Sequence, residues 1–203
     1  MLKKHLILIG ILISLALFGV SVSLYPGGSM FDKNSVGFLW TQNFISNLFG
    51  EKAFNGAPNP SRYWGMAAMF FLSAALAVFF INYAKRIPHR GSSNVIKYLG
   101  AGGMIATFLI ATPLHDIMAT VASTLFLVCL FYITVFIYKT RLHVFKVLCS
   151  LCMLIFYYTL YIYGSGDVST LPIWQKINFG GMILLVLGLE YFTKPEDFGS
   201  VGK

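Results

Sequence analysis

The chain has 203 residues, of which 57% are hydrophobic, 16% aromatic and only 11% charged, and its mean hydropathy is +0.75. Soluble domains carry about a quarter charged residues, and so few polar side chains could not cover the outside of a soluble fold of this size. This composition excludes a soluble enzyme, a disordered chain and a disulfide scaffold. It predicts an all-α protein that crosses a membrane several times.

The apolar segments predict six transmembrane helices in a single membrane domain that covers residues 1–203. Each segment is close to the roughly 20 residues that a helix needs to cross a bilayer. Each must be helical, because lipid contains no hydrogen-bond partner for an unpaired backbone amide. The predicted spans cover residues 5–24, 60–83, 96–112, 117–138, 145–163 and 172–192. Short connections make spans three, four and five antiparallel neighbours.

The first span also resembles a secretory signal peptide. Lys3 and Lys4 precede an apolar run that ends in the small residues Ser21-Val22-Ser23. The run is about 20 residues long, whereas signal peptides usually have roughly 7–15 apolar residues. We therefore expect the segment to be retained as a span, since its cleavage would leave five spans and an external N-terminus.

Helix-start signals agree with these limits. Asn59-Pro60 has the pattern of an N-cap followed by proline at the first helical position. Thr170 and Pro172 open the sixth span in a similar way, and Asp116 is predicted to be the N-cap of the fourth.

The basic residues predict the orientation. If the N-terminus is cytoplasmic, 11 of the 15 Lys and Arg residues lie on the cytoplasmic side and 4 on the outer side. This asymmetry follows the positive-inside rule, so we expect a multi-pass protein of the plasma (inner) membrane with both termini cytoplasmic. The net charge of +8 is scattered over separate loops, which disfavours a nucleic-acid partner and favours attraction to anionic lipid.

The first outer loop, residues 25–59, is the longest connection. Val36, Trp40, Phe44 and Leu48 recur in it every four residues, with polar side chains in much of the remainder. This spacing predicts an amphipathic helix at the outer membrane surface.

Polar residues on the predicted outer side indicate an outward-facing polar cup. His115 and Asp116, in the turn between spans three and four, and Asp167, after span five, are the catalytic candidates if the protein is an enzyme. The candidate ligand-binding residues are Asn43, Ser46, Asn47, Arg62, Tyr161 and Asn178. Helix capping by Asp116, an Asx turn at Asp167 and an aromatic belt of tyrosines are the structural alternatives.

Charged residues near span ends have simple explanations. Lys176 is expected to reach the lipid headgroups, and Glu190 is expected to pair with Lys194 four residues later. With no charge at the depth of the bilayer centre, a transporter or channel is the least favoured function.

The cysteines favour a structural role. Cys129 lies in span four, and Cys149 and Cys152 lie in span five. Buried thiols explain them better than a zinc or redox motif, because no further ligand is near. No metal site and no cofactor are predicted.

Two segments carry a resemblance to a known family. Phe44-Ile-Ser-Asn-Leu-Phe-Gly50, followed by Asn55-Gly-Ala-Pro-Asn-Pro60 and an apolar span, resembles the first-loop pattern of the prokaryotic membrane family catalogued as domain of unknown function 998. That family has about six spans and an acidic residue where this chain has Asn47. A weaker likeness to Frag1/DRAM-type proteins rests on the long first loop, and alkaline-ceramidase-like hydrolases share polar residues near span ends but need a late histidine pair that is absent here. The resemblance implies a fold and a location without a known reaction.

Two functional hypotheses follow. In the first, the outer cup binds a lipid headgroup, a small ligand or a partner protein. In the second, the protein is a membrane-embedded hydrolase or transferase that acts on a lipid or lipid-linked substrate at the outer leaflet, with His115 as general base. The expected partners are membrane lipids, together with a membrane-protein partner or a second copy of the chain.

Overall fold

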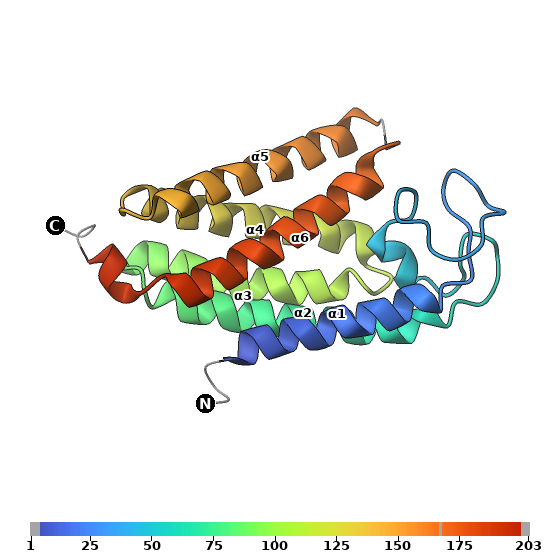
Figure 1. Ribbon diagram of the computed structural model, residues 1–203, viewed down its shortest axis with the longest axis horizontal. Coiled ribbons are helices and arrows are strands. Elements are labelled where there is room, and N and C mark those ends of the chain that lie inside the picture. Colours follow the sequence, from blue (N-terminus) through green and yellow to red (C-terminus); the bar gives the residue numbers. More distant parts are fainter. Residues whose placement is uncertain (1–4, 167, 200–203) are drawn as a thin grey trace.

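The computed structural model describes residues 5–166 and 168–199, which form a bundle of six long α-helices and one long loop (Figure 1). The helices are α1 (Leu6–Ser23), α2 (Ser61–Ala84), α3 (Arg90–Leu109), α4 (His115–Tyr138), α5 (His143–Ser165) and α6 (Leu171–Phe192), with short 3-10 helices η2 (Ile45–Phe49) and η3 (Pro195–Phe198). No β-strand forms in these two described ranges. The predicted all-α fold is confirmed.

Five of the helices, α1, α2, α4, α5 and α6, are long and apolar enough to cross a membrane. α3 is not among them, because its first turns carry Arg90, two serines, Asn94 and Lys97. It nevertheless packs against both α2 and α4 within the bundle. The span predicted at residues 96–112 therefore stays a prediction.

Successive helices are neighbours, so the predicted pairing of the third, fourth and fifth helices is confirmed. All six run roughly along the long axis of Figure 1. We call the end of the bundle that carries residues 24–60 the loop end. The opposite end, where α2 and α6 end, is called the Arg86 end after the residue that joins them.

α1 is packed closely along α2. The Ser14 hydroxyl donates to the Ala68 carbonyl oxygen at 2.8 Å, and the Ser21 hydroxyl donates to the Ser61 carbonyl oxygen at 2.9 Å. A Cβ added at Gly10 would lie 2.8 Å from the Cβ of Ala75, so the two backbones approach as closely as small residues allow.

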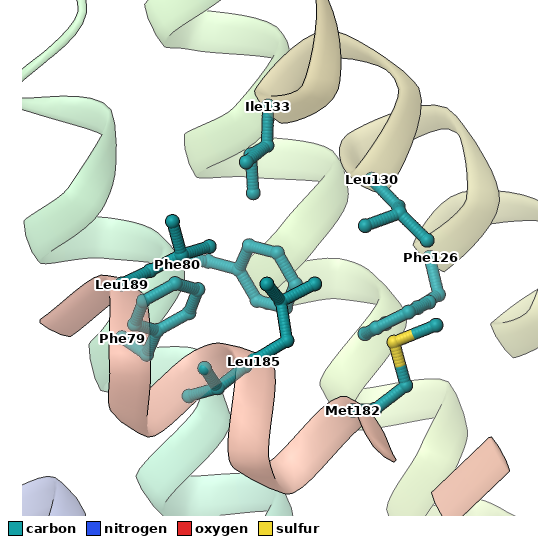
Figure 2. Close-up of a pocket in the computed structure, with 9 residues that line it drawn as sticks. Phe79, Phe80, Phe126, Leu130, Ile133, Met182, Leu185 and Leu189 are labelled. Carbon is teal, nitrogen blue, oxygen red and sulfur yellow. The ribbon is translucent and has the colours of Figure 1, made fainter. Parts of the chain in front are cut away.

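The core between α2, α4 and α6 is filled by aromatic and aliphatic side chains, which point toward one another in Figure 2. A cavity of about 10 Å³ remains among them, and its lining is entirely apolar. A space of that size holds at most about one water, which would find no polar partner there. It is a packing void and is too small for a ligand.

The three cysteines are buried free thiols, as predicted. Cys129 lies against the Ile96 carbonyl oxygen of α3, with 3.9 Å between sulfur and oxygen. Cys152 lies 3.8 Å from the Gly181 carbonyl oxygen of α6. Both therefore pack at contacts between helices.

The prediction of an amphipathic helix within the first loop is wrong. Gly37 has φ +70°, and only η2 is helical in this stretch. Val36 and Trp40, two members of the expected apolar face, are 87% and 62% exposed. Side chains of Asn43 and Asn47 accept the N–H groups of nearby residues, which gives the backbone an alternative to helical hydrogen bonds.

The helix starts follow the sequence signals in part. α6 begins at Leu171 after the N-cap residue Thr170, with proline in its first turn. The prediction for Asn59-Pro60 is wrong by one residue: Pro60 is the N-cap and α2 begins at Ser61, whose N–H the Asn59 side chain accepts. The prediction for Asp116 is wrong: α4 already begins at His115, so Asp116 lies inside the first turn.

Candidate functional site: a cleft at the loop end

Buried polar side chains fold the loop onto itself. Asn43 is 0% exposed; its amide accepts the Leu39 N–H at 2.8 Å and donates to the Gly28 carbonyl oxygen at 2.8 Å. The Tyr25 hydroxyl donates to the same Gly28 oxygen, and burial raises the pKa of this hydroxyl, so it stays protonated. A buried backbone N–H or C=O group without a hydrogen bond costs free energy of folding. In this loop the side chains supply the hydrogen-bond partners that a helix or a strand would otherwise provide.

A second group of polar contacts joins the loop to the start of α2. The Asn59 amide donates to the carbonyl oxygens of Asn47 and Gly50 at 3.2 and 2.9 Å. The Ser61 hydroxyl donates to the Asn59 side-chain oxygen at 2.5 Å and lies 3.2 Å from the Leu48 carbonyl oxygen. η2 is thereby fixed against the first turn of α2.

α6 holds the other side of the loop. The Gln175 side-chain oxygen accepts the Ile45 N–H at 2.9 Å. The Lys176 ammonium donates to the Asn43 carbonyl oxygen at 2.5 Å and lies 5.5 Å from the centre of the Phe38 ring. The prediction that Lys176 reaches lipid headgroups is therefore wrong, because its charge is directed at the loop. A lysine and a glutamine in the first two turns of an apolar span were the signal that sequence reasoning missed.

An open cleft of about 370 Å³ lies between η2, the start of α2 and the turn from α3 to α4. Three predicted site residues line it: Ser46, Arg62 and His115. The rest of its lining comes from Phe49, Gly50, Glu51, Ile110, Ala111, Thr112 and Pro113. The cleft thus combines charged and hydroxyl groups with an apolar wall.

Arg62 is the Lys or Arg residue among those that line this cleft. Its Nη1 donates to the Glu51 carboxylate at 2.7 Å, with the Arg62 side chain 28% exposed and that of Glu51 80% exposed. Its Nε is buried and has no hydrogen-bond partner among the described residues. The ion pair therefore uses one corner of the guanidinium and leaves the Nε–Nη2 edge unpaired. That edge has the geometry with which arginine binds a phosphate or carboxylate through two parallel hydrogen bonds.

His115 and Asp116 interact directly. The His115 Nδ1 lies 2.8 Å from an Asp116 carboxylate oxygen, and the two side chains are 43% and 95% exposed. A carboxylate at Nδ1 favours the tautomer in which Nε2 is free to accept a proton. Because both groups face solvent, the contact is weak as a source of stability.

The other predicted site residues lie elsewhere. Asn43 and Asn47 hold the loop, and Asn43 presents no surface to a ligand. Tyr161 is 71% exposed on α5, and Asn178 lies on α6 with a buried side-chain oxygen that has no partner among the described residues. Neither lines the cleft. Asp167 lies outside the described residues.

No group of three or more His, Cys, Asp or Glu side chains that could hold a metal ion occurs within residues 5–166 and 168–199. The chemistry available in the cleft is thus that of a guanidinium, an imidazole, hydroxyl groups and a carboxylate.

No protein-family model, curated protein or solved structure matches this chain. The segment that carries the resemblance stated above is η2 and its flanks. In it the Asn47 side chain accepts the Phe44 N–H at 2.7 Å and so caps η2. A carboxylate at this position would accept the same N–H, so capping alone accounts for a polar residue there.

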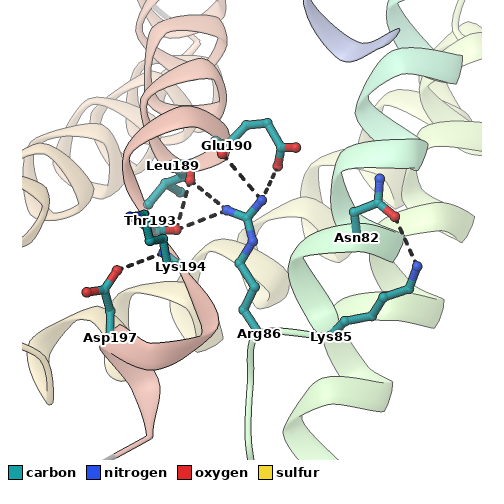
Figure 3. A network of polar contacts seen from close by, with 8 residues as sticks. All are labelled: Asn82, Lys85, Arg86, Leu189, Glu190, Thr193, Lys194 and Asp197. Carbon is teal, nitrogen blue, oxygen red and sulfur yellow. Dashed lines mark hydrogen bonds and ion pairs between the residues drawn. The ribbon is translucent and has the colours of Figure 1, made fainter. Parts of the chain in front are cut away.

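A second polar cluster lies at the Arg86 end (Figure 3). The Arg86 Nη2 lies 2.6 Å from the Glu190 carboxylate, and the two side chains are only 13% and 15% exposed. Its Nη1 donates to the Leu189 carbonyl oxygen and the Thr193 hydroxyl at 2.8 and 3.0 Å. Arg86 thus caps the last turn of α6, where carbonyl groups lack helical partners. The predicted pair of Glu190 with Lys194 is wrong, since Arg86 from α2 takes the carboxylate.

Proposed function

We propose that this chain is a six-span protein of the plasma (inner) membrane whose cleft at the loop end binds the anionic headgroup of a lipid. In this proposal α3 crosses the membrane in addition to the other five helices, and its polar first turns lie at the cytoplasmic interface. The loop end faces outward, and both termini are cytoplasmic. Membrane lipids are then the principal partners.

The distribution of cations supports the orientation. At the Arg86 end lie Lys85, Arg86, Arg90, Lys97, Lys139, Arg141, Lys146 and Lys194, against Lys33, Lys52, Arg62 and Lys176 at the loop end. An excess of Lys and Arg in short loops favours the cytoplasmic side.

The observation that carries the binding proposal is the unpaired Nε–Nη2 edge of Arg62 in a cleft with both polar and apolar walls. A phosphate on this edge would form two charge-assisted hydrogen bonds, and the Ser46 hydroxyl could donate to one of its remaining oxygens. Phe49, Ile110 and Pro113 give the apolar part of a lipid a surface that a free anion would not use. A small soluble ligand or a partner protein with an acidic side chain are the alternative occupants.

Substitution of Arg62 by Gln tests the proposal. We expect the purified protein in detergent to bind short-chain phosphatidic acid at least tenfold more weakly when Arg62 is replaced, as measured by native mass spectrometry. The variant Glu51→Gln should bind more tightly than the original chain, because it releases the guanidinium corner that Glu51 occupies.

Lys52→Gln is the matched control, since it removes the same charge from an exposed neighbour outside the cleft. Equal losses in Lys52→Gln and Arg62→Gln would mean that general surface charge, and not the cleft, attracts the lipid. Equal affinity for phosphatidic acid and soluble glycerol phosphate would favour a small ligand. Binding that is unchanged in Arg62→Gln overturns the proposal.

The contact between His115 and Asp116 favours a second candidate, a hydrolase or transferase acting on a lipid-linked substrate at the outer leaflet. The imidazole would take a proton from the attacking group, and Asp116 would orient it. The open cleft and the 43% exposure of His115 favour binding over this reaction. A turnover of phospholipid or lipid-linked ester that disappears in His115→Gln, while lipid binding is kept, would establish the enzyme.

A further inference from the structure

The turn between α4 and α5 concentrates positive charge at the Arg86 end. Residues 139–146, which comprise this turn and the first four residues of α5, contain the cations Lys139, Arg141 and Lys146, together with His143, and no acidic residue. The turn is well defined, because the buried Thr140 hydroxyl donates to the Ile137 carbonyl oxygen at 2.7 Å and accepts the Leu142 N–H at 3.2 Å. We call residues 139–146 the basic turn.

None of these cations is neutralised within the described part of the chain, where Arg62 and Arg86 are the only Lys or Arg residues in an ion pair. Lys139 lies 5.4 Å from the centre of the Phe136 ring, which orders its side chain without removing its charge. The three acidic residues of this end, Glu190, Glu196 and Asp197, lie on or after α6, and Glu190 is bound by Arg86.

The start of α5 adds to the positive potential. Leu142 is the N-cap residue and makes no side-chain capping contact. The N-terminal end of the helix dipole therefore points at the basic turn without a protein group to balance it. An anion placed there would be stabilised by the helix as well as by the side chains.

A continuous apolar surface begins at the same place. Val144, Val147, Leu151 and Leu154 lie on one side of α5 and are 70%, 67%, 49% and 66% exposed. The Tyr138 hydroxyl, 2.6 Å from the Ser150 hydroxyl, joins α4 to α5 beside this surface. Cationic and apolar surfaces thus follow one another along a single helix.

From this juxtaposition we propose that the basic turn binds the headgroup of an anionic phospholipid whose acyl chains lie along the exposed side of α5. Lys139, Arg141 and Lys146 contact the phosphate oxygens. The adjoining apolar stripe requires an amphiphile, so a nucleic acid or a free phosphate would leave half of the site unused. Basic clusters directly next to transmembrane helices bind anionic headgroups in this manner.

A triple variant, K139Q/R141Q/K146Q, tests the site by native mass spectrometry of the full chain with phosphatidylglycerol and phosphatidylcholine. Each cation near a membrane surface contributes about a fivefold gain in affinity for anionic lipid, so the variant should bind phosphatidylglycerol up to about 100-fold more weakly. Binding of phosphatidylcholine, which has no net charge, should change less than about twofold.

The matched control K85Q/R90Q/K194Q removes the same charge from the same end of the bundle outside the basic turn. It should retain most of the phosphatidylglycerol affinity. A loss as large as that of the first variant overturns the proposal, because the lipid would then respond to total charge only. Tight binding of soluble glycerol phosphate would also overturn it.

A variant that keeps the charge separates binding from folding. K139R/K146R should bind phosphatidylglycerol like the original chain, since the headgroup recognises positive charge. If K139Q/R141Q/K146Q melts at the original temperature and still binds phosphatidylglycerol with the original affinity, the basic turn is not a lipid site.

Discussion

The two ends of the bundle use polar side chains in opposite ways. At the loop end, amides and hydroxyls such as those of Asn43 and Asn59 are buried and bound to backbone groups. At the Arg86 end, the turns between helices are short and one ion pair is nearly buried, and among the described residues no other Lys or Arg of this end forms an ion pair.

This difference follows from the number of backbone groups that each end buries away from water. A loop of more than 30 residues that packs against helix ends carries many backbone groups away from water, and side chains must satisfy them. Short turns bury few backbone groups, so their charged side chains are not needed as hydrogen-bond partners for the backbone. A polar residue at this end is therefore structural unless its polar atoms lack partners, and the Nε of Arg62, in the first turn of α2, meets this condition in the cleft.

Replacing Arg86 by Ala should have the largest effect and tests whether one residue holds the Arg86 end together. The change leaves the Glu190 carboxylate nearly buried without its partner and exposes the last carbonyls of α6. We expect the free energy of unfolding in detergent to fall by about 3 kcal/mol, measured by reversible denaturation followed by circular dichroism.

The neighbouring Lys85→Ala is the control for that change. Lys85 is exposed and its ammonium donates only to the Asn82 side chain. Its loss should stay within about 0.5 kcal/mol. If both variants are equally stable, Arg86 does not carry the stability of this end.

Asn43→Ala should have the next largest effect and addresses the loop end. It deprives the Leu39 N–H and the Gly28 carbonyl oxygen of a partner in a fully buried position, at a cost of about 2 kcal/mol. Hydrogen exchange should accelerate across residues 27–50 while the helices stay protected. Asn55→Ala, at an exposed position with one bond to the Ala57 N–H, should leave exchange unchanged. Uniform acceleration of the helices as well would contradict a local role.

Lys176→Met should have the smallest effect, about 1 kcal/mol, because it removes the Lys176 contact with the loop and leaves the one made by Gln175. Methionine keeps about the length of the side chain but removes the charge beside the Phe38 ring and leaves the Asn43 carbonyl oxygen without this donor. Exchange should rise mainly at residues 38–46. The exposed Lys52→Met serves as the control, and an identical exchange pattern in the two variants would refute the contact.

The bundle could be predicted from the sequence because apolar length is a strong signal in lipid. Both limits of α2 lie within one residue of the prediction, and both limits of α4 lie within two residues of it. α3 was located correctly but begins six residues earlier than predicted, at Arg90, because polar residues continue its helix beyond the apolar segment. There the Ser93 hydroxyl donates to the Ala84 carbonyl oxygen at the end of α2 at 2.6 Å, a contact that hydropathy does not report.

The site was only partly predictable, because long-range partners decide which polar groups are free. Local spacing paired Glu190 with Lys194, whereas Arg86, 104 residues earlier in the chain, takes the carboxylate. A four-residue period suggested a helix at residues 36–49, yet the asparagines in it bind the backbone. Ser46, Arg62 and His115 were predicted from their residue types and their expected positions on the outer side. That they share one cleft depends on where the fold places η2, the start of α2 and the α3–α4 turn.

The contact of Lys176 with Asn43 joins residues 133 positions apart. During synthesis the loop is made long before α6. The hydrogen bond between Asn43 and Lys176 can therefore form only after the last helix has been synthesised. The segment that leads into η2 thus reaches its final contacts only when α6 is in place, so binding at the proposed cleft would follow assembly of all six helices.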